Sequence, residues 1–210
     1  MKKYYFAYGS NLNLDDAKTK GVSENVLTPY KKARLPDERL VFNFYSPSRD
    51  CGVLNIEAAI GHYVEGYLFE VLSEDGWRAL DRKEGHPNYY CREMVIVLDD
   101  DGQEIEALTY RVVPERISDF IAPSEEYFEI CRQGRIRFGL QTEELELAAQ
   151  NRKPGKCNAI FVYGTLMTDQ TREKAWEKIK IETRHTDYIY GVLYNYGSYP
   201  GLVLNTQGLV

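Results

Sequence analysis

The chain has 210 residues, 43% of them hydrophobic and 28% charged, which is typical of a globular protein with room for one large domain or two small ones. Its net charge of -6 argues against nucleic-acid binding, because a phosphate-binding surface needs an excess of basic residues. No apolar run approaches the roughly 18–20 residues that span a bilayer, and no signal peptide is recognisable at the start, so we expect a cytoplasmic protein that is not embedded in a membrane.

Short segments rich in aromatic and β-branched residues predict a first domain made mainly of strands. The first strand, residues 3–8, ends at Gly9, and the second, residues 39–45, ends at Ser46-Pro47. Further strands are predicted over residues 55–60, 63–71, 93–98 and 105–113. Asp100-Asp101-Gly102 lies between the last two and is a strong hairpin signal.

Four helices are predicted among these strands. The first covers residues 11–21, with Asn11 or Asn13 as its cap and Gly21 at its exit. The others cover residues 74–82, 124–134 and 142–150, and Ser124 would cap the third. The helices do not alternate regularly with the strands. The pattern therefore predicts an α+β fold, a small mixed β-barrel with flanking helices, rather than a doubly wound sheet.

A change of character near residue 150 indicates a domain boundary. Residues 151–156 are polar and contain Pro-Gly, as linkers often do. Residues 160–167 then repeat the aromatic strand and Tyr-Gly-Ser/Thr turn of residues 5–12, with a helix predicted at 169–179 and a strand at 190–197. We therefore expect a first domain at 1–150 and a duplicated second unit at 157–210, which is short enough to be partial.

Motifs for metals and cofactors are missing from the sequence. The four cysteines contain no C-x-x-C pair, and the three histidines lack ligand spacing. There is no P-loop, no dinucleotide-binding G-x-G-x-x-G, no H-E-x-x-H and no nucleophile elbow. We therefore expect no metal ion and no cofactor.

The turn after the first strand can carry chemistry without such motifs. Gly9 lets a ligand approach the main chain, and the helix start behind it leaves backbone N–H groups pointing outward beside the positive end of the helix dipole. Ser10 and Asn11 can add side-chain donors. The turn can therefore cradle a carboxylate or a carbonyl oxygen, although strand–glycine–helix turns are commonly structural.

Glu84 is the candidate base. It precedes Gly85-His86-Pro87, where a helix ends and the chain turns, and Tyr90 follows as a wall of a cleft. Burial among aromatic rings would raise the pKa of the carboxyl group and make it a competent base near neutral pH. From the residues alone, the alternative is a surface glutamate paired with Lys83 or Arg82.

Five segments, in order between residues 3 and 145, together resemble the γ-glutamylcyclotransferase-like superfamily. The opening Tyr5-Phe6-Ala7-Tyr8-Gly9-Ser10-Asn11-Leu12 is similar to the hallmark loop of that family, and Leu80-Asp81-Arg82-Lys83-Glu84-Gly85 is similar to the segment with its catalytic glutamate. Tyr90-Cys91-Arg92 matches a Tyr-x-Arg that trails this segment. Residues 64–71 resemble the strand before the acidic helix, and residues 122–127 resemble a Pro-Ser-x-x-Tyr element.

This resemblance implies a small barrel and an enzyme that uses neither metal nor cofactor. Its reaction would cyclise the γ-glutamyl group of a small molecule to 5-oxoproline and release an amine, an amino acid or a peptide. Carried over by position, Glu84 would be the general base and Tyr127 would help to bind the substrate. The other residues that the resemblance assigns to substrate binding are Tyr5, Phe6, Ala7, Tyr8, Gly9, Ser10, Asn11 and Tyr90.

The second unit resembles the smaller plant-defence-like branch of the same superfamily. Residues 161–166 match its loop, and residues 191–202 match its next strand and turn, but no counterpart of Glu84 is found there. We therefore expect an active site confined to the first domain, with a leaving amine that the sequence does not define. Two other hypotheses stay open, a non-catalytic module that binds γ-glutamyl or other carboxylate ligands, and an amide hydrolase whose base activates water.

Overall fold

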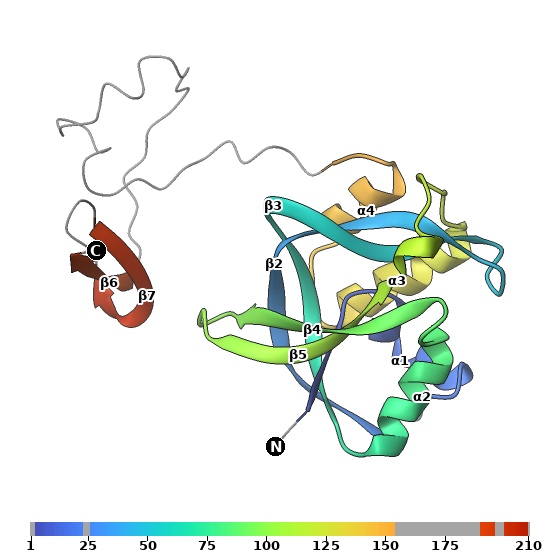
Figure 1. The fold of residues 1–210 in the computed structure, drawn as a ribbon, viewed down its shortest axis with the longest axis horizontal. Coiled ribbons are helices and arrows are strands. Elements are labelled where there is room, and N and C mark those ends of the chain that lie inside the picture. The colour runs from blue at the N-terminus through green and yellow to red at the C-terminus, as the bar shows by residue number, and fades with distance from the viewer. Residues whose placement is uncertain (1–2, 23–25, 154–189, 196–199, 210) are drawn as a thin grey trace, which may run out of the picture. The chain divides into compact units, whose positions relative to one another are not determined.

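Two long antiparallel strands, β2 (Leu27–Ser46) and β3 (Cys51–Val71), form the largest part of the sheet. The computed structural model describes residues 3–22, 26–153, 190–195 and 200–209, and the chain falls into two units, Met1–Lys156 and Cys157–Val210. In the first unit β1 (Tyr4–Ala7), β4 (Tyr90–Asp99) and β5 (Glu104–Val112) complete a closed barrel in the order β1-β3-β2-β4-β5 (Figure 1). The expected α+β fold with a small mixed barrel is confirmed.

The barrel is mixed because β1 pairs differently with its two neighbours. It runs antiparallel to β3 along its whole length, from Tyr4 opposite Glu70 to Ala7 opposite Tyr67. It meets β5 in parallel, with Tyr5 opposite Leu108, and this contact closes the barrel.

The long strands correct the predicted strand boundaries. β3 is continuous through the two strands predicted at 55–60 and 63–71, and β2 begins well before the predicted residue 39. Gly61, with a φ of 82°, lies at the expected break. Its backbone N–H donates to Asp37 Oδ1 at 2.8 Å, and the register of β2 shifts between Pro36 and Glu38. The strand pair therefore bends here instead of ending.

The hairpin predicted at Asp100-Asp101-Gly102 is confirmed between β4 and β5. Gly102 has a φ of 74° and its N–H donates to the carbonyl of Asp99 at 3.0 Å. The two strands pair in register from Tyr90 opposite Val112 to Leu98 opposite Glu104.

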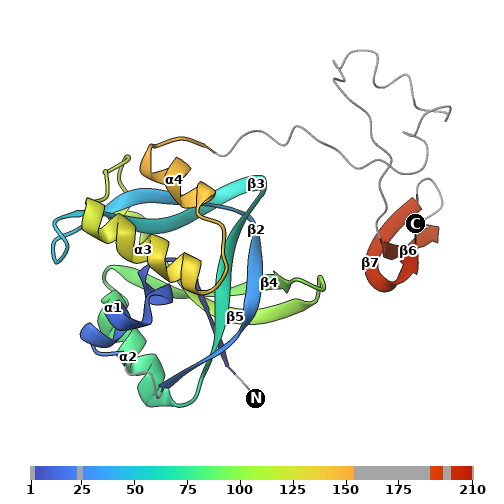
Figure 2. The same cartoon turned by 180° about the vertical axis from the view of Figure 1, so that it is seen from behind.

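Helices flank the barrel, as predicted, with adjusted ends. They are α1 (Leu14–Thr19), α2 (Glu74–Glu84), α3 (Glu125–Arg137) and α4 (Glu143–Ala149), with short 3-10 turns η1 (Ser10–Leu12) and η3 (Pro114–Arg116). α3 and α4 lie beside the paired β2 and β3 in both views of the ribbon, and α1 and α2 lie together at another part of the barrel (Figures 1 and 2).

The start of the first helix differs from the prediction in a way that matters for the site. Asn13, not Asn11, caps α1, because its side chain accepts a hydrogen bond from the backbone N–H of Asp16. Residues 10–12 instead form the separate turn η1, which leaves the buried Asn11 side chain available for other contacts. Ser124 caps α3 as predicted.

The second unit is described only at its end. There β6 (Tyr190–Asn195) pairs with β7 (Pro200–Leu209) in an antiparallel ribbon, and β6 coincides with most of the strand predicted at 190–197. The strand predicted at 160–167 and the helix at 169–179 lie outside the described residues, so the duplication stays a prediction. In the part of the chain that the structure describes, no helix is both long and apolar enough to cross a membrane.

Candidate active site

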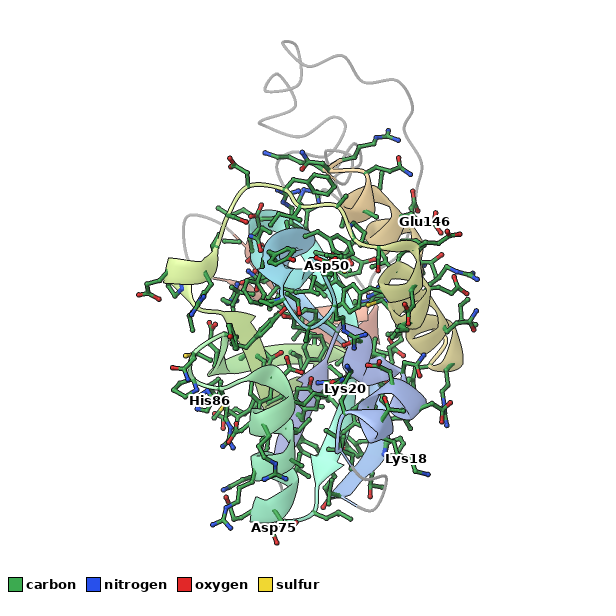
Figure 3. The ribbon with its side chains drawn as sticks, turned by 90° about the vertical axis from the view of Figure 1, so that its right-hand side faces the viewer. Lys18, Lys20, Asp50, Asp75, His86 and Glu146 are labelled. Carbon is green, nitrogen blue, oxygen red and sulfur yellow. The ribbon has the colours of Figure 1, made fainter. Side chains whose placement is uncertain are left out.

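A pocket opens where the turn after β1 meets the end of α2. It encloses about 300 Å³ of space between its atoms, part of which is open to solvent. The lining residues come from β1 and the turn after it, β3, α2, β4, β5 and α3, and are Tyr5, Tyr8, Gly9, Ser10, Asn11, Leu54, Glu84, Tyr90, Tyr110 and Tyr127. Figure 3 views the first unit from the side where α1 and α2 lie next to each other, with His86 just beyond the end of α2.

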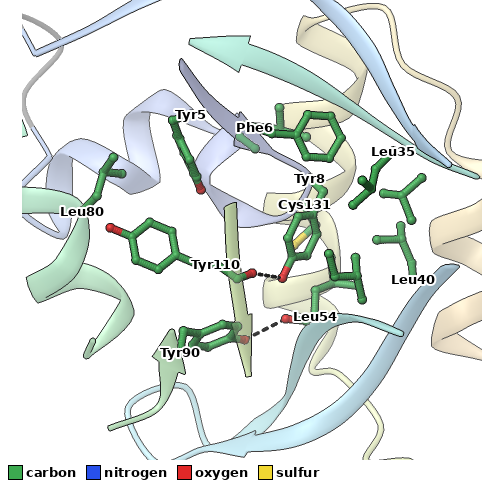
Figure 4. Close-up of a cluster of buried hydrophobic side chains, with 14 of the residues drawn as sticks. Tyr5, Phe6, Tyr8, Leu35, Leu40, Leu54, Leu80, Tyr90, Tyr110 and Cys131 are labelled. Atoms are coloured by element: carbon green, nitrogen blue, oxygen red, sulfur yellow. Dashed lines mark hydrogen bonds between the residues drawn. The ribbon is translucent and has the colours of Figure 1, made fainter. Parts of the chain in front are cut away.

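Most of the predicted site residues meet in this pocket, but Phe6 and Ala7 do not line it. Both are fully buried in the hydrophobic core. Because successive side chains of a strand point to opposite faces, Phe6 leaves the side that carries Tyr5 and packs inside the barrel (Figure 4). An added Cβ at Gly66 would meet the Phe6 ring at 2.5 Å, so the fit is close. Phe6 and Ala7 therefore pack in the core, and their expected contact with substrate stays a prediction.

The turn after β1 presents unpaired backbone donors to the pocket. The carbonyls of Gly9 and Ser10 accept from the N–H groups of Leu12 and Asn13, each at 3.0 Å, which winds the turn. The N–H groups of Gly9, Ser10 and Asn11 donate to no residue that the structure describes. A Cβ added at Gly9 would meet only Leu54, at an ordinary contact distance of 3.7 Å. The pocket therefore has room for an added methyl group at Gly9, next to these donors.

Glu84 is held at the pocket by the way α2 ends. It is the last residue of the helix, and Gly85 follows in the left-handed conformation with a φ of 63° and a ψ of 33°. The backbone N–H groups of Gly85 and His86 donate to the carbonyls of Arg82 and Asp81 at 3.3 and 2.9 Å. This glycine-terminated end fixes the direction in which Glu84 leaves the helix.

The carboxylate of Glu84 is half-buried, and only one of its two oxygens accepts a hydrogen bond from a described residue. Asn11 Nδ2 donates to Glu84 Oε1 at 2.7 Å and to the Tyr5 hydroxyl at 2.6 Å. Glu84 Oε2 has no hydrogen bond from any described residue. Burial raises the pKa of Glu84, and this effect outweighs the nearby positive charge of Lys83 and the hydrogen bond from Asn11. The arrangement gives a carboxylate with an oxygen able to accept a proton at the pocket.

Tyrosine side chains line the pocket, and three of their hydroxyl groups form hydrogen bonds with the main chain. Tyr90 donates to the carbonyl of Leu54 at 2.7 Å, and Tyr8 donates to the carbonyl of Tyr110 at 2.7 Å (Figure 4). The Tyr127 hydroxyl accepts from the N–H of Leu54 at 3.4 Å. Burial raises the pKa of Tyr8, Tyr90 and Tyr127, so these hydroxyls stay protonated and neutral.

Two pocket residues, Leu54 and Tyr110, were not predicted. Tyr110 stands opposite Arg92 in the β4–β5 hairpin, and its hydroxyl donates to Asp81 at 2.7 Å. Arg92 also holds Asp81, through two hydrogen bonds of 2.7 and 2.5 Å. Counting outward from the predicted turn at residues 100–102 would have placed Tyr110 opposite Arg92. Leu54 has no comparable signal, because its contacts depend on the pairing of β2 with β3.

The residues that the structure describes contain no group of three or more His, Cys, Asp or Glu side chains placed to hold a metal ion. The pocket instead offers one carboxylate, backbone N–H donors and tyrosine hydroxyls. This set can bind a small polar molecule and transfer a proton.

Comparison with known protein families and sequences gives matches to gamma-glutamyl cyclotransferases. Residues 5–129 match the family described as "Gamma-glutamyl cyclotransferase, AIG2-like". A protein of Methanocaldococcus jannaschii, whose name assigns gamma-glutamylcyclotransferase activity provisionally, is 45% identical over 51 residues, which cover 24% of this chain and 41% of that protein.

Solved structures share the fold. One titled gamma-glutamyl cyclotransferase is 24% identical, with a TM-score of 0.61, and the match covers 77% of this chain and 94% of that chain. An uncharacterised protein from Homo sapiens gives the same score and coverage at 25% identity. YkqA from Bacillus subtilis has a TM-score of 0.61 at 24% identity, with 71% of this chain and 54% of that chain covered.

Proposed function

The chain belongs to the gamma-glutamyl cyclotransferase, AIG2-like family, and from this membership we propose that it converts a γ-glutamyl amine, amino acid or peptide to 5-oxoproline and the free amine. One observation carries the proposal. Glu84, with its raised pKa, shares a pocket with the unpaired N–H groups of the turn after β1.

The proposed reaction needs one base because the substrate contains its own nucleophile. A free α-amine has a pKa of about 8, so at neutral pH it is mostly protonated. Glu84 accepts a proton from this ammonium group through its free oxygen. The amine nitrogen then attacks the γ-carbonyl carbon and loses a second proton as the ring forms. The bond to the leaving nitrogen breaks, and that nitrogen receives both protons, so the released amine leaves in its ammonium form. Ring closure is intramolecular, so correct folding of the substrate supplies much of the acceleration.

The N–H groups of Gly9, Ser10 and Asn11 would donate hydrogen bonds to a negatively charged group of the substrate. They can bind the α-carboxylate or the oxygen that gains charge when the γ-carbon is attacked. Tyr90 and Tyr127 would enclose the γ-glutamyl group. The reaction as proposed passes through no metal ion or cofactor.

We propose that this activity resides in the first domain, residues 1–150. All lining residues of the pocket fall between Tyr5 and Tyr127, which supports this assignment. Residues 151–156 would then be a linker and 157–210 a partial second unit. The cytoplasmic location stays a prediction from the sequence.

A panel of γ-glutamyl dipeptides, glutathione and γ-glutamyl amines tests the proposal. We expect 5-oxoproline from at least one substrate, in the presence of a metal chelator, and none from the folded variant Glu84→Gln. Tight calorimetric binding without product would support a binding module instead. Incorporation of labelled water oxygen into released glutamate would support a hydrolase. Full turnover by Glu84→Gln would remove Glu84 from the role of base.

A further inference from the structure

Lys83 is a buried charged residue next to Glu84 that does not line the pocket. Its side chain is 5% exposed. A lysine is rarely buried without partners, because removing an ammonium group from water is unfavourable unless other groups compensate. Its Nζ donates to Asn11 Oδ1 and lies 3.5 Å from Asp16 Oδ2. Lys83 therefore faces the turn after β1 and the first turn of α1, not solvent.

The contact with Lys83 determines which way the Asn11 amide points. An ammonium group only donates hydrogen bonds, so its partner on Asn11 must be the oxygen. Both hydrogens of Nδ2 are then directed to Glu84 Oε1 and the Tyr5 hydroxyl. A flipped amide would turn its NH₂ group toward the ammonium and its oxygen toward the carboxylate, and both contacts would be lost.

We propose that Lys83 is a positioning residue for Glu84, which acts by locking the Asn11 amide so that this amide holds Glu84 Oε1 and leaves Oε2 free for the substrate. The inference rests on the proposed function of Glu84 as the base. It assigns Lys83 no contact with the substrate.

The charges around Glu84 come from several elements. Lys83 and Arg49 are the nearby cations, and Asp16 on α1 is the nearby anion. Arg49, in the turn between β2 and β3, is held by Asp16 at 2.7 Å. Tyr5, Tyr8 and Tyr90 face Glu84 as neutral groups, because burial raises their pKa. Without the Lys83 charge, Arg49 would be the one cation left near the carboxylates of Glu84 and Asp16. The pKa of Glu84 should then rise, because its negative charge is stabilised less.

The test combines turnover with a measurement that needs no turnover. Full-length protein with ¹³C-labelled glutamate side chains is titrated by NMR, and the Glu84 signal is assigned by its loss in Glu84→Gln. In Lys83→Met we expect the titration midpoint of Glu84 to rise by about one pH unit. We also expect kcat to fall on the order of 100-fold, with little change in KM, because the base is displaced while the binding donors remain.

Two further variants sharpen the result. Lys83→Gln keeps a donor for Asn11 without the charge, so it should show the same upward shift of the midpoint with a smaller loss of kcat, and it serves if Lys83→Met unfolds. Arg82→Met removes an exposed positive charge one position away on the same helix and should match the parent protein. An unchanged Glu84 midpoint in both Lys83 variants would overturn the proposal. Absence of 5-oxoproline from the parent protein would contradict only the proposed function, because the titration requires no substrate.

Discussion

The side-chain amide of Asn11 donates to the carboxylate of Glu84 across 2.7 Å and so joins the turn after β1 to the last residue of α2. The two segments are far apart in the sequence, and each would be an ordinary structural element alone. Because the amide hydrogens of Asn11 are already used by Glu84 and Tyr5, its side chain holds the Glu84 carboxylate instead of donating to a ligand. Any substrate contact at this residue would come from its backbone N–H.

The acid limb of the pH–rate profile is expected to report Glu84. The proposed base must be deprotonated, so kcat/KM should fall as pH falls through the pKa of Glu84. Burial raises that pKa, so the limb should lie above the value of about 4.3 of an ordinary glutamate. Initial rates between pH 4 and 8 measure it. A limb at or below the ordinary value would contradict a desolvated base.

The contribution of Glu84 to the stability of the protein should decrease with pH over the range in which Glu84 loses its proton, whereas the activity should increase. A carboxyl group with a raised pKa binds its proton more tightly in the folded state than in the unfolded state. Its contribution to the free energy of unfolding is therefore largest below the unfolded pKa of about 4.3 and is lost as pH rises through the folded pKa. Urea unfolding of the parent protein and of Glu84→Gln at several pH values should show this decline in the difference between their free energies of unfolding, because the other carboxyl groups contribute equally to both. The same slope in both proteins would contradict the assignment.

Gly9→Ala should impair binding without impairing folding. The new Cβ would meet Leu54 at an ordinary distance of 3.7 Å, so the melting temperature should stay close to that of the parent. The methyl group would stand before the backbone donors of the turn, where we expect it to raise KM by about tenfold or more. Steady-state kinetics and thermal unfolding measure the two effects. Unchanged kinetics in the folded variant would show that the ligand does not approach the turn.

Gly85→Ala should impair both stability and activity. Gly85 has a φ of 63°, which disfavours other residues, and an added Cβ would meet Tyr89 Cδ2 at 2.4 Å. We expect a loss of roughly 1–3 kcal/mol in the free energy of unfolding and displacement of the neighbouring Glu84. Gly102→Ala is the matched control, because its φ of 74° is similar and no described atom lies within 4 Å of the added Cβ. It should lose less stability and no activity. Equal effects would mean that Tyr89 does not constrain the end of α2.

Residues 1–153 alone should retain the activity of the full chain. The barrel closes within this segment, and all residues that line the pocket belong to it. Truncation before residue 154 should therefore leave kcat/KM within about threefold of the parent, a difference of less than 1 kcal/mol. A folded truncated protein with much lower activity would show that the second unit contributes to catalysis.

Local patterns in the sequence located both halves of the candidate site, but the family resemblance was needed to join them, because each pattern alone also had an ordinary structural explanation. The strand ending at Gly9, the glutamate at the end of a helix and the Ser124 cap that positions Tyr127 are short-range features, and each lies where it was predicted. Side-chain direction was harder to predict. The motif includes Phe6 and Ala7 with their neighbours, but the closed barrel buries both in the core.

Features that depend on long-range pairing were missed. The continuity of β3 through Gly61 results from its contact with Asp37 on the neighbouring strand, which local propensity does not report. Leu54 enters the pocket through the same pairing. The tie between Lys83 and Asn11 likewise needs the packing of α2 against the turn after β1, and the sequence alone left Lys83 as a candidate surface partner of Glu84.

Tyr5 closes the barrel opposite Leu108 and also lines the pocket. Separation of β1 from β5 would therefore open the barrel wall and remove one side of the pocket in a single event. Molecules in which β1 has separated from β5 would lack a complete pocket and should be inactive. We expect opening of this edge to abolish the proposed activity before the rest of the sheet unfolds, and faster amide exchange in β1 would detect such opening.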